Sequence, residues 1–246
     1  MPDILITDDG PIRTIRMNRP DKKNALTLPM YDAMSDAMEE RWADLRCILI
    51  AGAPGAFTAG NDIGDFVKAS ESGALAAPVL RFLHVLMRCE TPLVAAVSGI
   101  AVGIGTTMLL HCDHVVAGTD ARLSTPFVPL GLAPEAASSL IAPRMMGHAR
   151  AFSLLAMGRP LSADDAKAAG IVNQVVAPRD LEETALAAAR EIAALPPESV
   201  KIARTLLRGP IEEIVARSDH EADIFQRRLK SPEAKAAFAA FLSRKR

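Results

Sequence analysis

SGIAVGIGTT, residues 98–107, follows an apolar, strand-like run at residues 93–97 and leads into a helix-like pattern. Residues 55–63, GAFTAGNDI, stand in the same relation to the apolar run at residues 47–51. Glycine at such turns lets the backbone approach a ligand closely and direct its N–H groups at it. Two loops of this kind can converge on one oxygen atom and stabilise it as it becomes negative, as an oxyanion hole does.

Strand-like and helix-like segments alternate around these two loops. Residues 3–8 and 12–17 alternate in polarity about the turn signal Asp9-Gly10-Pro11, which predicts a β-hairpin. Residues 28–44 carry Met or Trp at every fourth position from Met30, so we expect one amphipathic helix with a buried face. This alternation predicts an α/β fold with βαβ-type crossovers.

The last part of the chain has a helical pattern throughout. Four helices are expected, separated by proline pairs or by Gly-Pro and Ser-Pro, at residues 181–195, 198–207, 211–229 and 233–242. We place a boundary near Pro196, between an α/β body of residues 1–195 and a helical region of residues 196–246. Four helices of this size bury little surface on their own. We therefore expect them to pack on their own body, on a neighbouring subunit, or on both.

The composition is that of an ordinary soluble protein, with 50% hydrophobic and 23% charged residues among 246 and a net charge of −1. This charge gives no case for a nucleic-acid or membrane-surface partner. The uncharged run at residues 93–110 has the length of a short membrane span, but its glycines and threonines favour a buried strand, a turn and a short helix. Three widely spaced cysteines and no visible secretory signal predict free thiols and a cytoplasmic protein.

The sequence His111-Cys112-Asp113-His114 looks at first like a metal-binding cluster. If these residues form a strand, adjacent side chains point to opposite faces, so all four cannot bind one ion. We therefore expect core and strand-end residues here, and no metal. The chain also lacks the simplest motifs for ATP hydrolysis, Rossmann cofactor binding, zinc proteolysis and esterase chemistry.

Glu135, within LAPEAASSL at residues 132–140, is the best candidate for proton transfer beside the two glycine loops. The alternative is an ordinary glutamate in the first turn of a helix, where it follows a proline and is favoured by the helix dipole. The apolar neighbours of Glu135 in the sequence predict a raised carboxyl pKa through desolvation. Such a group suits a base that must also return its proton.

An ordered set of short motifs runs along the chain: Asn18-Arg19-Pro20, Asn24-Ala25-Leu26, residues 56–63, residues 92–105, Cys112-Asp113 and residues 166–172. In this order, the set resembles the enoyl-CoA hydratase/isomerase (crotonase) superfamily. The resemblance implies a crotonase-like spiral of ββα units, followed by a C-terminal helical trimerisation region in a homotrimer or a dimer of trimers. It also implies an acyl-CoA substrate from fatty acid metabolism, with coenzyme A as part of the substrate and no separate cofactor.

The resemblance also assigns site residues. It implies that the backbone N–H groups of Asn61 and Ile104 donate hydrogen bonds to the thioester oxygen. The residues expected beside the acyl-CoA are Ala25, Thr58, Ala59, Gly60, Asp62, Ile63, Gly103, Phe127 and Leu130. Asp62 has a second interpretation, as a purely structural helix N-cap.

Departures from the family pattern carry information about the reaction. Hydratases of this family have two glutamates where this chain has Thr107 and Phe127, and neither residue can act as an acid or base toward water. Glu135 stands where hydratases have glycine, and its surroundings resemble the peroxisomal-type Δ3,Δ2-enoyl-CoA isomerases, in which the matching glutamate is the only catalytic base. The resemblance therefore implies an enoyl-CoA isomerase. The alternatives are a hydratase or another crotonase-type lyase or hydrolase, and a non-catalytic acyl-CoA-binding homologue.

Overall fold

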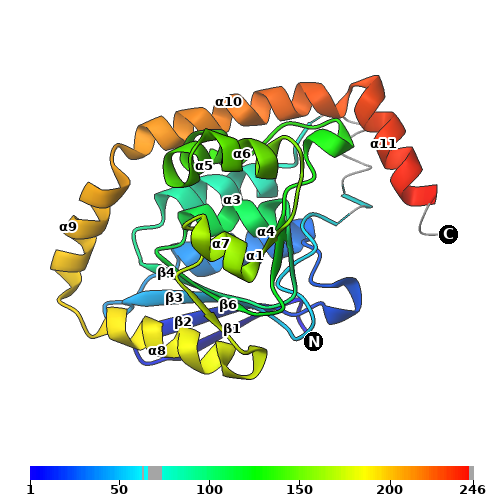
Figure 1. Ribbon diagram of the computed structural model, residues 1–246. Helices are drawn as coiled ribbons and strands as arrows, with labels where there is room; N and C mark the ends of the chain where they lie inside the picture. Colours follow the sequence, from blue (N-terminus) through cyan, green and yellow to red (C-terminus); the bar gives the residue numbers. More distant parts are fainter. Residues whose placement is uncertain (63, 66–73, 244–246) are drawn as a thin grey trace.

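A computed structural model of the chain describes residues 1–62, 64–65 and 74–243 (Figure 1). Its larger sheet has six strands in the order β1 (Ile4–Asp9), β2 (Ile12–Met17), β3 (Cys47–Gly52), β4 (Leu93–Val97), β6 (His114–Gly118) and β9 (Gln174–Val176). Strands β1 and β2 are antiparallel, and all later neighbours are parallel. The predicted N-terminal hairpin is therefore confirmed.

A smaller sheet contains β5 (Ile100–Val102), β7 (Arg122–Ser124) and β8 (Leu161–Ser162), in that order. Strand β5 follows β4 and strand β7 follows β6, so the chain passes repeatedly from the large sheet to the small one. After β3, Thr58 continues this pattern by forming a parallel bridge with Ala101. This repetition gives the predicted spiral of ββα units.

The second glycine segment is more ordered than we expected. Residues 98–107 contain the whole of β5 and the start of α4 (Ile104–Thr107), where the sequence pattern indicated only a loop before a helix. Strand β5 has three residues and lies between Gly99 and Gly103, both of which have positive φ. A strand this short, with a glycine turn on each side, is too brief to show an alternating pattern.

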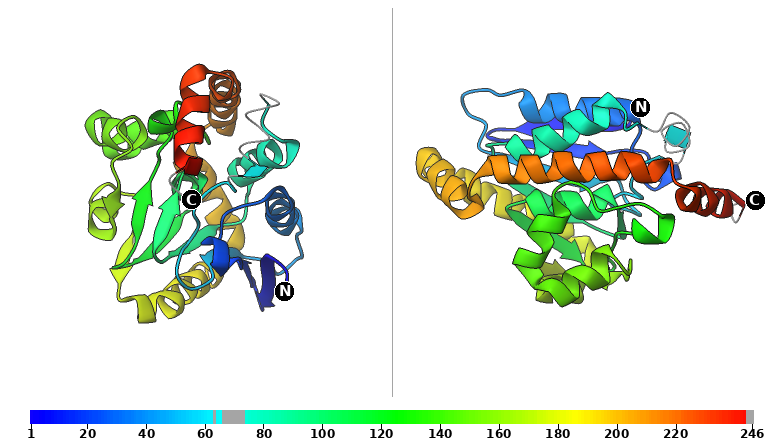
Figure 2. Two further views of the ribbon diagram at one scale, coloured as in Figure 1. Left: turned by 90° about the vertical axis from the view of Figure 1, so that its right-hand side faces the viewer. Right: turned by 90° about the horizontal axis from the view of Figure 1, so that it is seen from above.

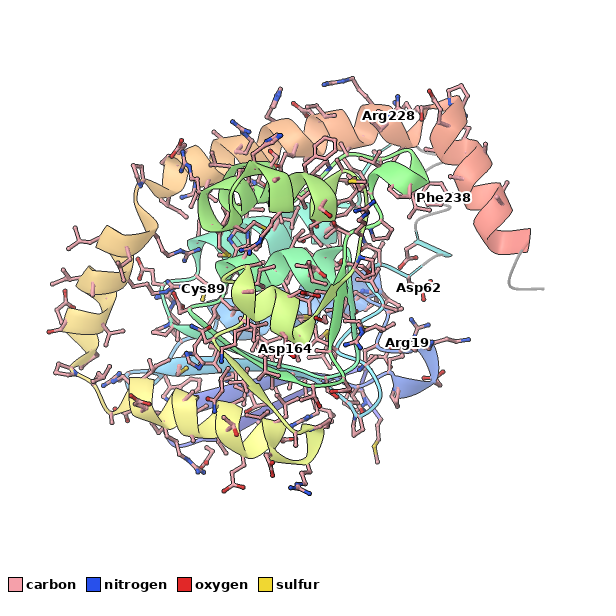
Figure 3. All side chains as sticks on the ribbon, in the orientation of Figure 1. Arg19, Asp62, Cys89, Asp164, Arg228 and Phe238 are labelled. Carbon is pink, nitrogen blue, oxygen red and sulfur yellow. The ribbon has the colours of Figure 1, made fainter. Side chains whose placement is uncertain are left out.

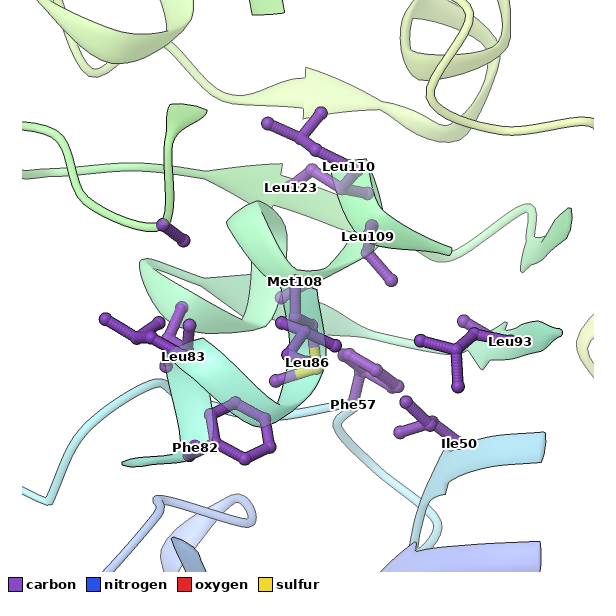
Figure 4. Packing of buried hydrophobic residues seen from close by; sticks show 14 of the residues in the cluster. Ile50, Phe57, Phe82, Leu83, Leu86, Leu93, Met108, Leu109, Leu110 and Leu123 are labelled. Carbon is purple, nitrogen blue, oxygen red and sulfur yellow. The ribbon is translucent and has the colours of Figure 1, made fainter. Parts of the chain in front are cut away.

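Helices cover both faces of the larger sheet (Figure 1). Helix α8 (Leu181–Ala193) packs against one face of the sheet. Its residues Leu181, Ala185 and Ala189 form a hydrophobic cluster with the strand side chains of that face. On the other side lie α1 (Leu28–Glu39) and α3 (Ala77–Arg88), which also pack against each other. The main core, part of which is drawn in Figure 4, fills the space between these helices and the two sheets.

Helix α1 ends earlier than its methionine pattern predicts. Met30, Met34 and Met38 are buried as expected, but the helix stops at Glu39 and Trp42 lies beyond it. The buried guanidinium of Arg13 donates to the carbonyl oxygen of Ala37 at 3.1 Å and stacks on Trp42 at 4.6 Å. The end of α1 is thus set by a partner from β2, which periodicity alone does not show.

The remaining helices complete the molecule. Between β7 and β9 lie α5 (Ser138–Met146), α6 (His148–Leu155) and α7 (Ala163–Ala168). The helices at the end of the chain are α9 (Pro197–Arg208), α10 (Ile211–Leu229) and α11 (Pro232–Ser243), close to their predicted positions. Short 3₁₀ turns are η1 (Pro20–Lys22), η2 (Met108–His111), η3 (Val128–Leu130) and η4 (Pro178–Asp180).

The C-terminal helices pack on the body of the same chain. Helix α10 lies across α3 and α5, and α11 contacts η3 (Figures 1 and 2). Phe225, Leu229 and Phe238 belong to the same core cluster as the body. Among the described residues, no helix has the length and apolar character to cross a membrane. The uncharged run at residues 93–110 is shared among β4, β5, α4 and η2.

Candidate active site

A cavity of about 750 Å³ lies where the two glycine segments meet. Its wall includes parts of η1, the first glycine segment, the start of α4, η3 and Phe238 of α11. Nine of the residues assigned to the site line it: Ala25, Ala59, Gly60, Asn61, Asp62, Gly103, Ile104, Phe127 and Leu130. Ile63 was also assigned to the site, but it lies outside the described residues.

Asn61 and Ile104, whose main-chain N–H groups were assigned to the thioester oxygen, both line this cavity. The backbone amides of the neighbouring residues are used in the fold: Leu26 donates to Gly60 at 2.8 Å, and Asp62 donates to Leu26 at 2.8 Å. Ile104 is the first residue of α4, where an N–H has no acceptor within its own helix. Within the described part of the chain, neither N–H has a hydrogen-bond acceptor in the protein.

Backbone pairing holds the two segments together. The amide of Thr58 donates to the carbonyl of Ile100 at 3.0 Å, and the amide of Val102 donates to the carbonyl of Thr58 at 3.0 Å. Gly60 has a φ of +83°, and a Cβ atom there would lie 2.7 Å from the carbonyl oxygen of Val102. Only glycine allows this close approach, so the spacing between the two segments depends on it.

Thr58 has a different place from the one we expected beside the substrate. It is fully buried and is absent from the cavity wall. Its hydroxyl donates to the carbonyl of Asn24 at 2.6 Å and accepts from the amide of Gly60 at 3.0 Å. Thr58 therefore shapes the loop from behind, because both functions of its hydroxyl are used by the backbone.

Asp62 lines the cavity and is held by two contacts. One carboxylate oxygen accepts from the amide of Gly64 at 2.9 Å, which is the bonding expected of an N-cap. The other accepts from Arg19 at 2.7 Å, and this ion pair lowers the pKa of Asp62 against the effect of its partial burial. Figure 3 shows Arg19, Asp62 and Phe238 on the same side of the molecule.

Helix α5 begins only at Ser138, and Glu135 is the first residue of the turn that precedes it. The interpretation as an ordinary glutamate in the first turn of a helix is therefore wrong. The side chain is 8% exposed and is not part of the cavity wall. Its Oε1 atom accepts a hydrogen bond of 2.5 Å from the hydroxyl of Thr107. Thr107 is in α4, three residues after Ile104, so the carboxyl is tied to the helix that carries one of the N–H groups.

Burial determines the acidity of Glu135. It raises the pKa of the carboxyl from 4.5 to about 8, while the hydrogen bond from Thr107 acts in the opposite direction. The nearby carboxyl of Glu221, from α10, raises the pKa further. The direction and the cause agree with the desolvation predicted from the sequence. A carboxyl with this pKa exists in both protonation states near neutral pH.

Several cavity residues were not among those assigned from the sequence. Arg19, Lys22 and Lys23 place positive charge at the cavity, and Leu132 and Phe238 add apolar surface. These basic residues lie in or directly after the Asn-Arg-Pro motif, so their position in the sequence could have predicted that they line the cavity. Phe238 comes from a helix more than a hundred residues after the glycine segments, and no local pattern connects it to them.

The possible metal cluster is divided among different elements. His111 ends η2, His114 begins β6, and Cys112 and Asp113 lie between them. Only His114 lies in a strand, so alternation along a strand does not decide where these four side chains point. Asp113 pairs with Arg204, and His111 contacts the carbonyl oxygen of Ala136. Across the residues that the structure describes, no group of three or more His, Cys, Asp or Glu is placed to hold a metal ion.

Comparison with known proteins identifies the family. Residues 8–246 match the family described as enoyl-CoA hydratase/isomerase. The chain is 37% identical to enoyl-CoA delta isomerase 2 of Rattus norvegicus, over 98% of this chain and 64% of that protein. It is 30% identical to a probable enoyl-CoA hydratase of Rhizobium meliloti (strain 1021), over 99% of this chain and 96% of that protein. The chain thus spans slightly less than two thirds of the delta isomerase.

Solved structures give the same result. The chain is 44% identical to Pseudomonas aeruginosa OdaA, with a TM-score of 0.93 and 98% of each chain covered. An enoyl-CoA hydratase/isomerase from Pseudoalteromonas atlantica T6c is 39% identical, with a TM-score of 0.93 over 99% of this chain and 98% of that one. These matches confirm the α/β crotonase fold with C-terminal helices. The chain belongs to the enoyl-CoA hydratase/isomerase family, whose members act on acyl-CoA substrates and typically need no cofactor.

Proposed function

We propose that this protein is a Δ3,Δ2-enoyl-CoA isomerase that uses Glu135 as its only acid–base group. The observation that carries the proposal is the buried carboxyl of Glu135, bonded to Thr107 on the helix that begins with Ile104. Hydration needs a pair of acid–base groups, and Thr107 and Phe127 supply neither member. Moving a double bond needs one carboxyl that accepts a proton and then returns it.

The proposed reaction starts with the 3-enoyl thioester in the cavity. The Glu135 carboxylate takes a proton from C2, the electron pair of that C–H bond forms a double bond between C1 and C2, and the carbonyl pair moves onto the thioester oxygen, which gives a dienolate conjugated with the double bond between C3 and C4. The N–H groups of Asn61 and Ile104 would stabilise this dienolate, and each such donor is typically worth about 3–4 kcal/mol of barrier. Glu135 then returns the proton to C4, which leaves the double bond between C2 and C3. Because Glu135 is outside the cavity wall, the acyl chain must extend past Ile104 to reach it.

The pKa of Glu135 suits both halves of this reaction. When the pKa of a carboxyl lies close to the working pH, a substantial fraction of the carboxyl is ionised and can accept a proton. Once protonated, the same buried carboxyl is a ready acid toward C4 of the dienolate. An exposed glutamate with a pKa of 4.5 would be a weaker base toward C2.

Thr107→Val is expected to move the pH dependence of kcat/KM to higher pH. Removing the hydrogen bond takes away a contact that lowers the pKa of Glu135, so that pKa rises above about 8. A hydrogen bond to a charged group is worth about 1.5–3 kcal/mol, which corresponds to roughly 1–2 pH units. We therefore expect a loss of about 10-fold at pH 7 and recovery near pH 10. Thr107→Ser keeps the hydroxyl and should resemble the wild type, whereas an unmoved acid limb in the valine variant would contradict this role.

The basic residues at the cavity support a coenzyme A substrate. Arg19 is paired with Asp62, whereas Lys22 has no ion-pair partner within the described residues. Lys22→Gln is expected to raise KM about 2- to 5-fold with unchanged kcat, since an exposed charge contact is worth up to about 1 kcal/mol. Asp21→Asn, on the same 3₁₀ turn, should have the opposite effect. With an enoyl-pantetheine substrate, which lacks the nucleotide and its phosphates, both variants should behave as wild type. An equal rise in KM for that substrate would show that Lys22 does not act on the nucleotide phosphates of coenzyme A.

A hydratase is the second candidate, because relatives that match nearly the whole chain are named probable enoyl-CoA hydratases. Trans-3-hexenoyl-CoA and trans-2-hexenoyl-CoA, supplied separately, distinguish the two reactions. An isomerase converts the first into the second with no change of mass, whereas a hydratase adds the mass of one water to the second. Binding of both without conversion would indicate a non-catalytic acyl-CoA-binding homologue.

The assembly and the division of the chain are also proposals. We propose a homotrimer, alone or as a dimer of trimers, with residues 196–246 as the helical region that joins subunits. Ile202, Leu206 and Leu207 on α9 are 52%, 77% and 88% exposed in the single chain, which supports a subunit contact at this helix. Sedimentation equilibrium of the full chain measures the assembly size directly.

A further inference from the structure

The turn that carries Glu135 has an unfavourable backbone. Ala136 and Ala137 have φ angles of 59° and 55°, and both are buried. The left-handed region is disfavoured for any residue with a Cβ atom, and alanine has no side-chain polar group to compensate. Two such residues in succession persist only where the surrounding structure holds them. The contacts of this turn therefore determine where the Glu135 carboxyl lies.

One of these contacts comes from His111, the last residue of η2. Its Nε2 atom lies 2.8 Å from the carbonyl oxygen of Ala136, and the side chain is buried. Burial lowers the pKa of His111 to about 4, and Arg208 and Arg204 of α9 act in the same direction. The ring is therefore neutral near pH 7, and its Nε2–H group donates to Ala136.

The hydrogen bond from Nε2 of His111 leaves the other ring nitrogen, Nδ1, without a partner among the described residues. With the proton on Nε2, Nδ1 is a buried acceptor. A buried polar atom without a partner is unfavourable, and an apolar side chain at position 111 would avoid it. What imidazole adds at this position is the hydrogen bond to Ala136.

Other polar contacts of the turn bind other groups. Thr107 binds the Glu135 carboxyl, and the Glu221 carboxylate accepts from the amide of Ser139 at 2.9 Å and also interacts with the backbone amide of Ala137. The carbonyl of Glu135 accepts from the amide of Ser138 at 3.1 Å. In the described part of the chain, His111 is the only side chain that binds the carbonyl of Ala136.

We propose that His111 is a positioning residue for proton transfer: its N–H group fixes the Ala136 carbonyl and so holds the strained turn that aims Glu135. This inference rests on the proposed function of Glu135. It makes His111 neither an acid nor a base, because the ring stays neutral throughout the working pH range. Its role is to keep the Glu135 carboxyl within reach of C2 and C4.

Two substitutions separate the hydrogen bond from the volume of the side chain. In His111→Gln, the amide nitrogen can take the place of Nε2 and donate to Ala136, so kcat should stay within about 3-fold of wild type. His111→Met fills the space without a donor, so the turn relaxes. A misplacement of about 1 Å can cost 10²-fold, and we expect kcat to fall about 10- to 100-fold while KM changes less than 2-fold. Thermal unfolding of both variants identifies any loss that is due to stability alone.

A second readout does not depend on turnover. The pKa of the Glu135 carboxyl can be followed by ¹³C NMR, with Glu135→Gln identifying its signal. We expect a value of about 8 in the wild type and in His111→Gln, and a value shifted toward 4.5 in His111→Met as the relaxed turn admits water. Equal losses in both variants, or an unchanged kcat and an unchanged Glu135 pKa in His111→Met, would overturn the inference. A wild type that converts no enoyl-CoA would defeat the proposed function instead, and the NMR titration would still decide whether His111 holds the turn.

Discussion

Replacing Glu135 with glutamine is expected to lower the turnover of 3-enoyl-CoA by about 10²- to 10⁴-fold, the usual contribution of a positioned base. Glutamine keeps the shape of the side chain and an oxygen that accepts from Thr107, but it cannot take a proton from C2. Acyl-CoA binding should change less than about 3-fold, because glutamine has the size and shape of glutamate and leaves the residues that line the cavity unchanged. Steady-state kinetics and calorimetric binding of a saturated acyl-CoA measure the two effects separately.

The matched control for this variant is Glu213→Gln. Glu213 is on the surface of α10 and pairs with Arg144 at 2.6 Å, away from the cavity. Its replacement should leave turnover unchanged. A Glu135→Gln enzyme with turnover within 3-fold of wild type would remove the proposed base, whatever the control shows.

Gly60→Ala is expected to damage both the fold and the reaction. A methyl group there would lie 2.7 Å from the carbonyl oxygen of Val102, at a φ of +83° that alanine avoids. Overpacking and left-handed backbone together cost roughly 2–4 kcal/mol of stability. The variant must also move the amide of Asn61 away from that of Ile104, and loss of one oxyanion donor lowers kcat about 10²- to 10³-fold.

Gly55→Ala separates the two causes of this damage. Gly55 also has a positive φ, of +105°, but a Cβ atom there meets nothing within 4 Å. This variant should lose roughly 1–3 kcal/mol of stability and keep its turnover. Thermal unfolding and kcat are measured for both proteins. If Gly60→Ala and Gly55→Ala had equal turnover, the close approach at Val102 would not be needed to align the two amides.

Much of the fold could be predicted because its signals are local. The hairpin about Gly10, the buried runs of β3 and β4, and the helices of the C-terminal region appear as polarity patterns or as proline boundaries. Strand β5 was missed because three residues between glycine turns are too few to show alternation. The end of α1 was misplaced because Arg13, from a distant strand, binds the helix terminus.

In the candidate site too, features with a local sequence pattern could be predicted, and contacts between distant segments could not. The glycine segments are visible in the sequence because a close backbone approach requires glycine, as Gly60 against Val102 illustrates. Thr58 looked like a substrate contact, but its hydroxyl is used by the backbone of Asn24 and Gly60. The contact between His111 and Ala136 joins residues from separate elements and leaves no local pattern. Contacts of this kind become visible only in three dimensions.

The central claim is that one carboxyl carries a proton from C2 to C4, and an isotope label tests it most directly. Wild-type enzyme is given 3-hexenoyl-CoA with deuterium at C2, in ordinary water, and the product of a single turnover is examined by mass spectrometry and NMR. Because Glu135 is buried and screened from solvent exchange, we predict that deuterium removed from C2 appears at C4 of 2-hexenoyl-CoA. A product whose new C4 hydrogen comes entirely from water would contradict transfer by one buried carboxyl.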